Sequence, residues 1–263
     1  MKFQVLMSTM NKSQSDIEKI VQDHHVHCST LVINQTQGEL VQSQNEKLSI
    51  ISYHEKGLSK SRNRGLQNTN AEIALIADDD IEYVDDLENV IVNAFDEYKD
   101  YDIIAFYVET DEHLPAGEAK EIHFMHSLSL MSVQIAYRVQ SIKKHHIVFD
   151  ERFGTGSGKY TSGEENIFLS DCLKNGLKIL YVPRKIAYLL PEGESSWFHG
   201  FDEQFFLSKG ALFYRLSPRL SYLLNISFVI LKYPMYKKQL GIYKAYKAMK
   251  IGRKQMKDGK NES

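Results

Sequence analysis

The first 110 residues alternate short apolar runs with segments whose apolar residues recur every three or four positions. Apolar runs of about four to eight residues between turn residues predict buried strands, and the longer period predicts amphipathic helices. The predicted strands are 3–8, 28–34, 48–53, 72–77 and 102–108, and the predicted helices are 13–24, 57–68 and 85–98. This alternation predicts an α/β fold with a mostly parallel, doubly wound sheet flanked by helices.

The second half of the chain is less regular. Alternating apolar residues predict a strand over 130–137, and apolar periodicity predicts helices over 164–175 and 202–216. Two short strands, 178–182 and 186–190, are expected on either side of Pro183.

The last 44 residues form a tail of a different character. Its apolar segment, 222–231, is shorter than the roughly 20 residues that a membrane-spanning helix requires. A lysine-rich helix is expected next, with apolar residues three or four apart at Tyr236, Leu240, Tyr243, Tyr246 and Met249. This pattern favours a helix that lies on an anionic membrane surface. The alternative is a terminal helix that packs its apolar stripe on the domain.

Charge is divided unevenly along the chain, whose net charge is −2. Residues 232–263 hold ten basic and two acidic residues, whereas the rest hold 22 basic and 32 acidic ones. A basic tail on an acidic body indicates contact with an anionic surface. Nucleic acid is not expected as the partner, because no other feature supports it.

The two cysteines, Cys28 and Cys172, indicate a reducing compartment without a disulfide framework. The apolar stretch Phe3 to Met7 is too short for a secretion signal. A cytoplasmic location is therefore expected.

Three consecutive carboxylates, Asp78, Asp79 and Asp80, end the apolar run 74–77. Unpaired charges cannot be buried inside a strand, so the triplet is expected at its carboxyl end, where open α/β sheets bind ligands. Clustered carboxylate oxygens attract Mg²⁺ or Mn²⁺, which commonly accompany phosphate. The alternative is a solvated acidic turn that caps the next helix at Asp85 or Asp86.

One strand earlier, residues 57–65 read GLSKSRNRG. A Gly-Leu-Ser turn that opens a helix offers backbone N–H groups, and Arg62 and Arg64 are planar donors suited to phosphate. The alternative is a surface helix with two exposed arginines.

In this order, VLMSTMN, GLSKSRNRG and ALIADDDIEY resemble the nucleotide-sugar half of family 2 glycosyltransferases with the GT-A fold. The segment FDERFGTGSGKYTSGEENIFLSDCLKNGLKILYVP resembles the acceptor side of that family. The resemblance covers about residues 1–215. It implies a nucleotide-sugar-binding half (1–110) and an acceptor-binding half of the same GT-A domain (111–218). The basic amphipathic helical tail (219–263), expected from its charge and periodicity, follows them.

The resemblance assigns the donor side to a few residues. Thr9 and Asn11 match positions that contact the nucleoside, and Arg62 matches an arginine near the base and phosphates. Gln35 stands where the family often has an aspartate that reads the base; an amide can still pair with uracil.

Asp78 and Asp80 match the ends of the family's Asp-x-Asp motif. Asp80 is the expected ligand of Mn²⁺ or Mg²⁺, and Asp78 is expected nearer the ribose. Asp79 either contacts the ion and donor or is structural. His199 is a candidate for the late metal-binding histidine of GT-A enzymes, although many relatives place one closer to positions 189–190. The neighbouring Trp197 either stacks on a sugar or belongs to the core.

On the acceptor side, the resemblance makes Glu165 the general base, with Glu164 as its neighbour and substitute. The alternative is capping, because carboxylates in the first turn favour the helix dipole. Gly154, Gly156 and Gly158 would let the backbone approach a sugar closely, or form a flexible loop. The histidines at 24, 25, 27, 145 and 146 have no ligand-like companions at useful spacing and are expected at the surface.

The resemblance implies an inverting, metal-dependent hexosyltransferase. Its donor would be a nucleotide diphosphate sugar, with uridine expected, and its acceptor a hydroxyl of a glycan or lipid-linked oligosaccharide. The expected setting is capsule or other surface-polysaccharide synthesis at the inner face of the cell membrane. The alternatives are a sugar-phosphate nucleotidyltransferase and a non-catalytic nucleotide-sugar-binding scaffold.

Overall fold

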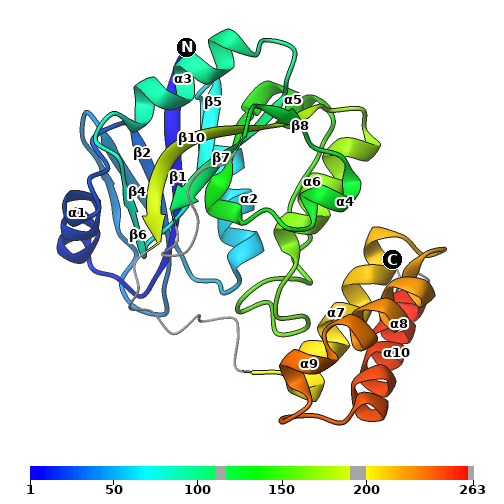
Figure 1. The fold of residues 1–263 in the computed structure, drawn as a ribbon. Coiled ribbons are helices and arrows are strands. Elements are labelled where there is room, and N and C mark those ends of the chain that lie inside the picture. The colour runs from blue at the N-terminus through cyan, green and yellow to red at the C-terminus, as the bar shows by residue number, and fades with distance from the viewer. Residues whose placement is uncertain (110–116, 190–199, 260–263) are drawn as a thin grey trace.

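The computed structural model describes residues 1–109, 117–189 and 200–259. An α/β body is followed by a group of C-terminal helices that stands beside it (Figure 1). The strands are β1 (Phe3–Met10), β2 (Thr30–Gln35), β3 (Gln42–Gln44), β4 (Leu48–Tyr53), β5 (Ile73–Asp78), β6 (Ile81–Tyr83), β7 (Ile103–Glu109), β8 (Lys120–Glu121), β9 (Ile135–Arg138) and β10 (Ile179–Leu189). The helices of the body are α1 (Gln14–Asp23), α2 (Leu58–Asn68), α3 (Leu87–Glu97), α4 (Phe124–Ser127), the 3₁₀ helix η1 (Ser132–Gln134), α5 (Val139–Lys144) and α6 (Glu164–Lys174). The C-terminal helices are α7 (Glu203–Leu216), α8 (Ser221–Leu231), α9 (Tyr233–Tyr236) and α10 (Ile242–Asp258).

Within the described residues the strands form one ten-stranded sheet in the order β3-β4-β2-β1-β5-β9-β7-β10-β6, with β8 also paired to β10. Strands β4, β2, β1 and β5 are mutually parallel, as are β7 and β10. Strand β9 lies antiparallel between β5 and β7 and joins the two parallel groups. The sheet is therefore mixed but mostly parallel, as the sequence predicts.

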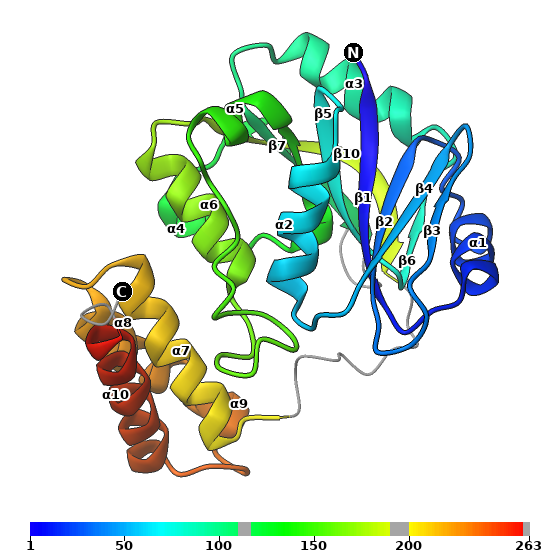
Figure 2. The same cartoon turned by 180° about the vertical axis from the view of Figure 1, so that it is seen from behind.

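Helices cover both faces of the sheet (Figures 1 and 2). On one face, Ile17 of α1 and Phe95 of α3 share a core with alternate residues of β1. On the other face, Leu66 of α2 and Phe168 of α6 pack with the intervening Leu6. Because successive side chains of a strand point to opposite faces, one strand supplies both cores.

A third core lies among the C-terminal helices and the segment before α6. Helices α7 and α10 cross where Gly210 and Gly252 face each other's backbones. A Cβ atom at Gly210 would overlap the Met249 carbonyl, and one at Gly252 would overlap the Leu207 carbonyl. The two helices therefore approach closely because neither glycine has a side chain.

The sequence-predicted strands and helices of the first half are present within two residues of their expected bounds. The prediction for 130–137 was wrong in part, because η1 occupies its centre and only β9 is a strand. The two strands expected around Pro183 are one strand, β10, since the proline falls at an irregularity of the register between Val182 and Lys185, where its missing N–H is tolerated. Position 190 lies outside the described residues.

The apolar stripe expected to face a membrane packs only in part inside the protein. Tyr236 and Met249 are fully buried, whereas Tyr243 is exposed. Helix α10 thus follows the alternative of a terminal helix that packs on its own protein. The exposed apolar residues of the C-terminal region lie instead mainly on α8 and around its ends.

Candidate active site

The predicted donor residues lie along one edge of the sheet. The register places Ser8 beside Asp78 and Thr9 beside Asn34. Gln35 is paired with Tyr53 at the ends of their strands. The carboxyl ends of parallel strands meet at one edge, which is where ligands bind in open α/β sheets.

Two members of the acidic triplet are held by hydrogen bonds. Asp79 accepts a 2.6 Å bond from the Thr9 hydroxyl. Asp78 Oδ1 accepts a 3.1 Å bond from Arg62, and Asp78 Oδ2 lies 3.5 Å from the Ser132 hydroxyl. Thr9 is itself buried, so its hydroxyl fixes the direction of Asp79.

Asp80, the third member, is exposed. Its partial loss of hydration and the charges of Asp78 and Asp79 raise the pKa of its carboxyl group. A bound divalent cation would relieve this crowding of like charge, and carboxylate oxygens are suitable ligands for Mg²⁺ or Mn²⁺. Asp80 and Asp78 are the residues that would hold such an ion. As the side chains stand, the three carboxylates do not converge as a ligand group, because the described residues whose ligand atoms lie within 4.8 Å of one another are His25, His27 and Asp85.

Arg62 joins the acidic triplet to the start of α6. Its Nη1 donates a 2.8 Å bond to Glu164 Oε1, and its Nη2 bonds Asp78 Oδ1. Arg62 and Glu164 are both buried. Burial alone would lower the pKa of Arg62, but Asp78 and Glu164 outweigh it and raise the pKa.

The two glutamates at the start of α6 differ in their surroundings. Glu164 is paired with Arg62, whereas Glu165 is partly exposed. Burial of the Glu165 carboxyl group and the negative charge of Glu164 raise the pKa of Glu165 to about 8. Glu165 is therefore the carboxyl group here whose proton can be exchanged near neutral pH.

Lys209 brings a positive charge from α7 toward these glutamates. Its neighbours on α7 contact the segment before α6: Ser208 accepts a 3.1 Å bond from the Thr161 N–H, and Leu212 abuts Gly163. Burial lowers the pKa of Lys209, while Glu165 and Glu164 oppose that shift.

Gln35 is buried and its amide is fully engaged with the turn before α2. Its Nε2 donates a 3.0 Å bond to the Gly57 carbonyl, and its Oε1 accepts a 2.9 Å bond from the Gly57 N–H. This geometry favours a positioning role for Gln35 over the base-reading role expected from the sequence.

The glycine-containing loop after Phe153 packs against the start of α2. The Ser59 hydroxyl donates a 2.7 Å bond to the Phe153 carbonyl. Gly154 has a φ of 101°, and a Cβ atom there would lie 3.1 Å from Glu164 Oε2 and 3.2 Å from Ser59 Oγ. A side chain at this position would be strained and crowded, so Gly154 lets the loop lie directly on the buried carboxylate.

Asn11, the remaining residue predicted on the donor side, lies next to Gln35. Asn11 is exposed just beyond β1, with a φ of 54°, and its N–H donates to the Gln35 carbonyl at 2.8 Å. His199 and Trp197 lie outside the described residues.

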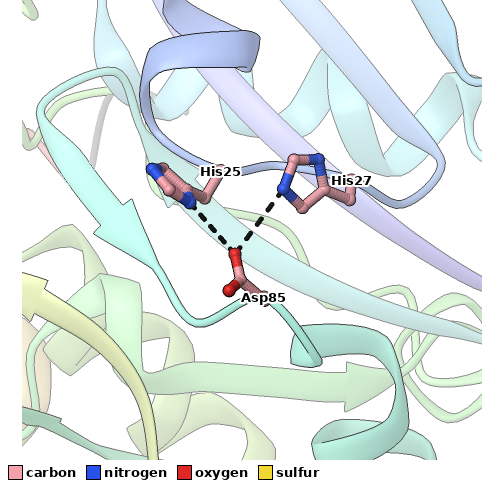
Figure 3. Close-up of side chains that lie close together, drawn as sticks. All are labelled: His25, His27 and Asp85. Atoms are coloured by element: carbon pink, nitrogen blue, oxygen red, sulfur yellow. Dashed lines mark hydrogen bonds and ion pairs between the residues drawn. The ribbon is translucent and has the colours of Figure 1, made fainter.

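Among the surface histidines, two have a companion that the sequence analysis did not find. His25 Nδ1 lies 3.0 Å from Asp85 Oδ1, and His27 Nε2 lies 3.6 Å from the same oxygen (Figure 3). All three side chains are exposed, as expected for the histidines. The prediction that they lack a ligand-like companion was wrong, because Asp85 is 60 residues away from His25 in the chain.

Three further residues of the site, Ser132, Asn63 and Lys209, were not predicted from the sequence. Asn63 holds the start of the acceptor-side segment, since its amide bonds both the N–H and the carbonyl of Phe149. Asn63 belongs to the GLSKSRNRG segment and could have been found there. Ser132 and Lys209 stand in no motif, and only the fold brings them to the site.

The mostly parallel sheet thus carries an acidic triplet at its carboxyl edge and a glutamate pair at the start of α6 beyond it. The profile of glycosyl transferase family 2 matches residues 13–156, which is more than half of the chain. The protein therefore belongs to glycosyl transferase family 2. No curated protein sequence is significantly similar to it.

Solved structures of TarS from S. aureus have a similar fold. TarS 1-349 in complex with UDP-GlcNAc has a TM-score of 0.63 at 16% identity, over 92% of this chain and 76% of that one. TarS 1-349 without a named ligand has a TM-score of 0.59 at 13% identity, over 98% of this chain and 92% of that one. TarS 1-349 in complex with UDP has a TM-score of 0.59 at 15% identity, over 92% of this chain and 76% of that one. At these identities the likeness establishes the fold, which is of the GT-A type.

Proposed function

We propose that the protein transfers a sugar from a nucleotide diphosphate sugar to a hydroxyl group, with inversion at the anomeric carbon. The observation that carries this proposal is the Arg62 bridge between Asp78 and Glu164. It holds the predicted donor carboxylates and the predicted base helix in one site, as a transfer between two substrates requires.

A uridine diphosphate sugar is the proposed donor. Support comes from membership of the family and from the likeness of the fold to TarS, which was solved with UDP-GlcNAc and with UDP. Thr9 and Asn11 stand at the end of β1, on the edge where the nucleoside would bind. A divalent cation held by Asp80 and Asp78 would supply positive charge to stabilise the leaving diphosphate.

Glu165 is the proposed general base. With Glu164 paired to Arg62, Glu165 is the member of the pair that can accept the proton of the attacking hydroxyl. A base whose pKa is close to the working pH is effective, and such groups contribute on the order of 10²–10⁴-fold. Glu164 would serve to orient Arg62.

The proposed acceptor is a glycan or lipid-linked oligosaccharide at the inner face of the cell membrane, in surface-polysaccharide synthesis. Helix α8 supports this setting, because Leu223, Ile226 and Ile230 recur along one side with 62%, 43% and 58% of their surface exposed. Leu231, at the end of the helix, is 75% exposed. Such a face matches an interfacial helix that inserts its apolar side chains shallowly.

The charge around α8 suits an anionic lipid surface. From 216 to 257 the chain has ten basic and no acidic residues. Basic residues next to a membrane each contribute about 1 kcal/mol of attraction to anionic lipid. No helix among the described residues has the length and apolar character needed to cross a bilayer. Peripheral attachment through α8 is therefore the proposed mode.

Transfer is tested with a panel of nucleotide diphosphate sugars and Mn²⁺, following release of nucleoside diphosphate by the full chain. We expect Asp80→Asn and Glu165→Gln each to lose at least about 100-fold in turnover, whereas Asp96→Asn, an exposed aspartate on α3, should match the unchanged protein. No release from any donor would indicate a scaffold. Release of pyrophosphate from a nucleoside triphosphate and sugar phosphate would indicate a nucleotidyltransferase.

Membrane contact is tested by co-sedimentation with vesicles of phosphatidylglycerol and phosphatidylcholine. We expect the double variant Leu223→Gln, Ile230→Gln to bind the anionic vesicles at least tenfold more weakly. Met125→Gln, at a residue of α4 that is 63% exposed, is the matched control. Equal binding of all three proteins would contradict attachment through α8.

A further inference from the structure

We propose that His25, His27 and Asp85 form a surface site for a transition-metal cation of the Zn²⁺ type, separate from the acidic triplet. One ligand atom of each residue lies within 4.8 Å of the other two. Figure 3 shows both imidazoles directed at the same carboxylate, from the connection between α1 and β2 on one side and the turn before α3 on the other.

The distances are close to those of a tetrahedral zinc centre. Zinc–nitrogen and zinc–oxygen bonds of about 2.0–2.1 Å place neighbouring ligand atoms about 3.3 Å apart. The separations from Asp85 Oδ1 to His25 Nδ1 and to His27 Nε2 are 3.0 and 3.6 Å and bracket that value. The nitrogen–nitrogen separation, within 4.8 Å, needs only rotation of exposed side chains to close.

The backbone holds the two histidines on one side. Val26 and Cys28 are buried at 4% and 5% exposure, so the alternate residues His25 and His27 both face solvent. The Tyr83 N–H donates a 3.1 Å bond to the His24 carbonyl and fixes this segment against the strand that leads to Asp85. The site is therefore partly organised before any ion binds.

The ligand types select the metal. Two imidazoles and one carboxylate suit Zn²⁺, Ni²⁺ or Cu²⁺, whereas Mg²⁺ and Mn²⁺ prefer all-oxygen sites such as the acidic triplet. An ion pair brings each imidazole to Asp85 Oδ1, and the two rings also meet edge to face with centroids 5.8 Å apart. A cation shared by all three would bind at this same point of convergence.

A bound ion would tie together the end of α1, the entry to β2 and the turn before α3. That turn follows the acidic triplet through the short strand β6. An ion that binds only the folded state stabilises it by mass action. We therefore expect Zn²⁺ to stabilise the protein without contacting the proposed donor site.

The test is a titration of the untagged full chain, freed of metal with chelator, with ZnCl₂ and with CoCl₂. We expect one equivalent of Zn²⁺ to bind with micromolar or tighter affinity, and Co²⁺ to give visible absorption typical of tetrahedral coordination. His27→Gln and Asp85→Asn should each weaken binding at least tenfold and abolish the rise in melting temperature with Zn²⁺. His126→Gln, an exposed histidine outside the cluster, should bind as the unchanged protein does.

Equal zinc binding by all four proteins would overturn the proposal, and so would the absence of binding at 100 micromolar ZnCl₂. That concentration is about 100 times the weakest dissociation constant expected, which is enough to raise the stability of the folded state by about 2.7 kcal/mol. Asp80→Asn separates the two metal sites, since it should leave the zinc titration unchanged whether or not the protein transfers sugar. The substituted residues are exposed, so their replacement leaves the core intact and the variants are expected to fold.

Discussion

Arg62 on α2 and Glu164 at the start of α6 form a buried ion pair, with Nη1 2.8 Å from Oε1, across 102 residues of chain. The same guanidinium reaches Asp78 at the end of β5. The pair thus connects the strand that carries the acidic triplet to the helix that carries Glu165.

Replacing Arg62 by methionine should destabilise the fold by about 3–5 kcal/mol, because a buried carboxylate would be left without its partner. Arg62→Lys should recover part of that loss, since an ammonium cannot donate to both carboxylates in the planar geometry of guanidinium. The measurement is urea unfolding of the full chain. Arg64→Met on the same helix is the control; Arg64 is 40% exposed and paired with Glu55, and its loss should cost about 1 kcal/mol or less.

Glu165→Gln should stabilise the protein at neutral and mildly alkaline pH while it abolishes transfer. In the folded state the pKa of Glu165 is raised from 4.5 to about 8, so keeping its proton favours folding. As the pH rises from about 4.5 to about 8 the unfolded state loses that proton first, and the stability of the unchanged protein falls. Glutamine has no proton to lose.

The difference in unfolding free energy between the Glu165→Gln variant and the unchanged protein should therefore be near zero at about pH 4 and on the order of 4 kcal/mol at about pH 8. Thermal or urea unfolding across this range provides the measurement. The exposed Glu203→Gln on α7 is the control and should show no such trend. A Glu165→Gln protein that is less stable at pH 8 than at pH 5, relative to the unchanged one, would refute the raised pKa.

Lys209→Met should move the rising limb of the rate–pH profile to higher pH. The positive charge of Lys209 opposes the rise in the pKa of Glu165, so its removal raises that pKa further. We expect a shift of about 0.5–1 pH unit in the limb of kcat/KM. Lys209→Arg keeps the charge and should keep the profile; an unmoved limb in the methionine variant would mean that Lys209 only packs against its neighbours.

Gly252→Ala should destabilise the C-terminal helices. Its new Cβ atom would overlap the carbonyl of Leu207 on α7, and such overpacking costs about 1–3 kcal/mol. Gly241→Ala lies at the start of the same helix with no atom near its would-be Cβ, and should cost less than about 1 kcal/mol. Limited proteolysis should cleave the Gly252→Ala protein faster within α8 and α10; equal rates in both variants would contradict the close crossing.

Much of the donor side could be read from the sequence because its signals are local. Apolar runs ending in polar residues located most of the strands, and apolar residues three or four positions apart located α1, α2 and α3. The same reasoning placed Asp78 at a strand end, since consecutive carboxylates cannot be buried in a strand. The resemblance to a family then gave these residues their expected roles.

Sequence patterns are ambiguous where one local pattern fits two environments. A Lys/aromatic stripe suits a membrane or a neighbouring helix, and only the crossing at Gly210 and Gly252 shows that α10 packs on α7. Gln35 has the chemistry to read a base, yet in the fold its amide closes on Gly57. Neither contact can be predicted from the few residues that surround it in the sequence, because its partner lies far away in the chain.

The sequence alone determined most strands and helices of the first half, the acidic triplet and the basic tail, because periodicity and the cost of burying charge act over short stretches of chain. Tertiary structure decided which carboxylate pairs with Arg62, which one keeps a raised pKa, and which histidines share Asp85. These depend on groups far apart in the chain that become neighbours only in the fold, where distance and loss of water set their energies.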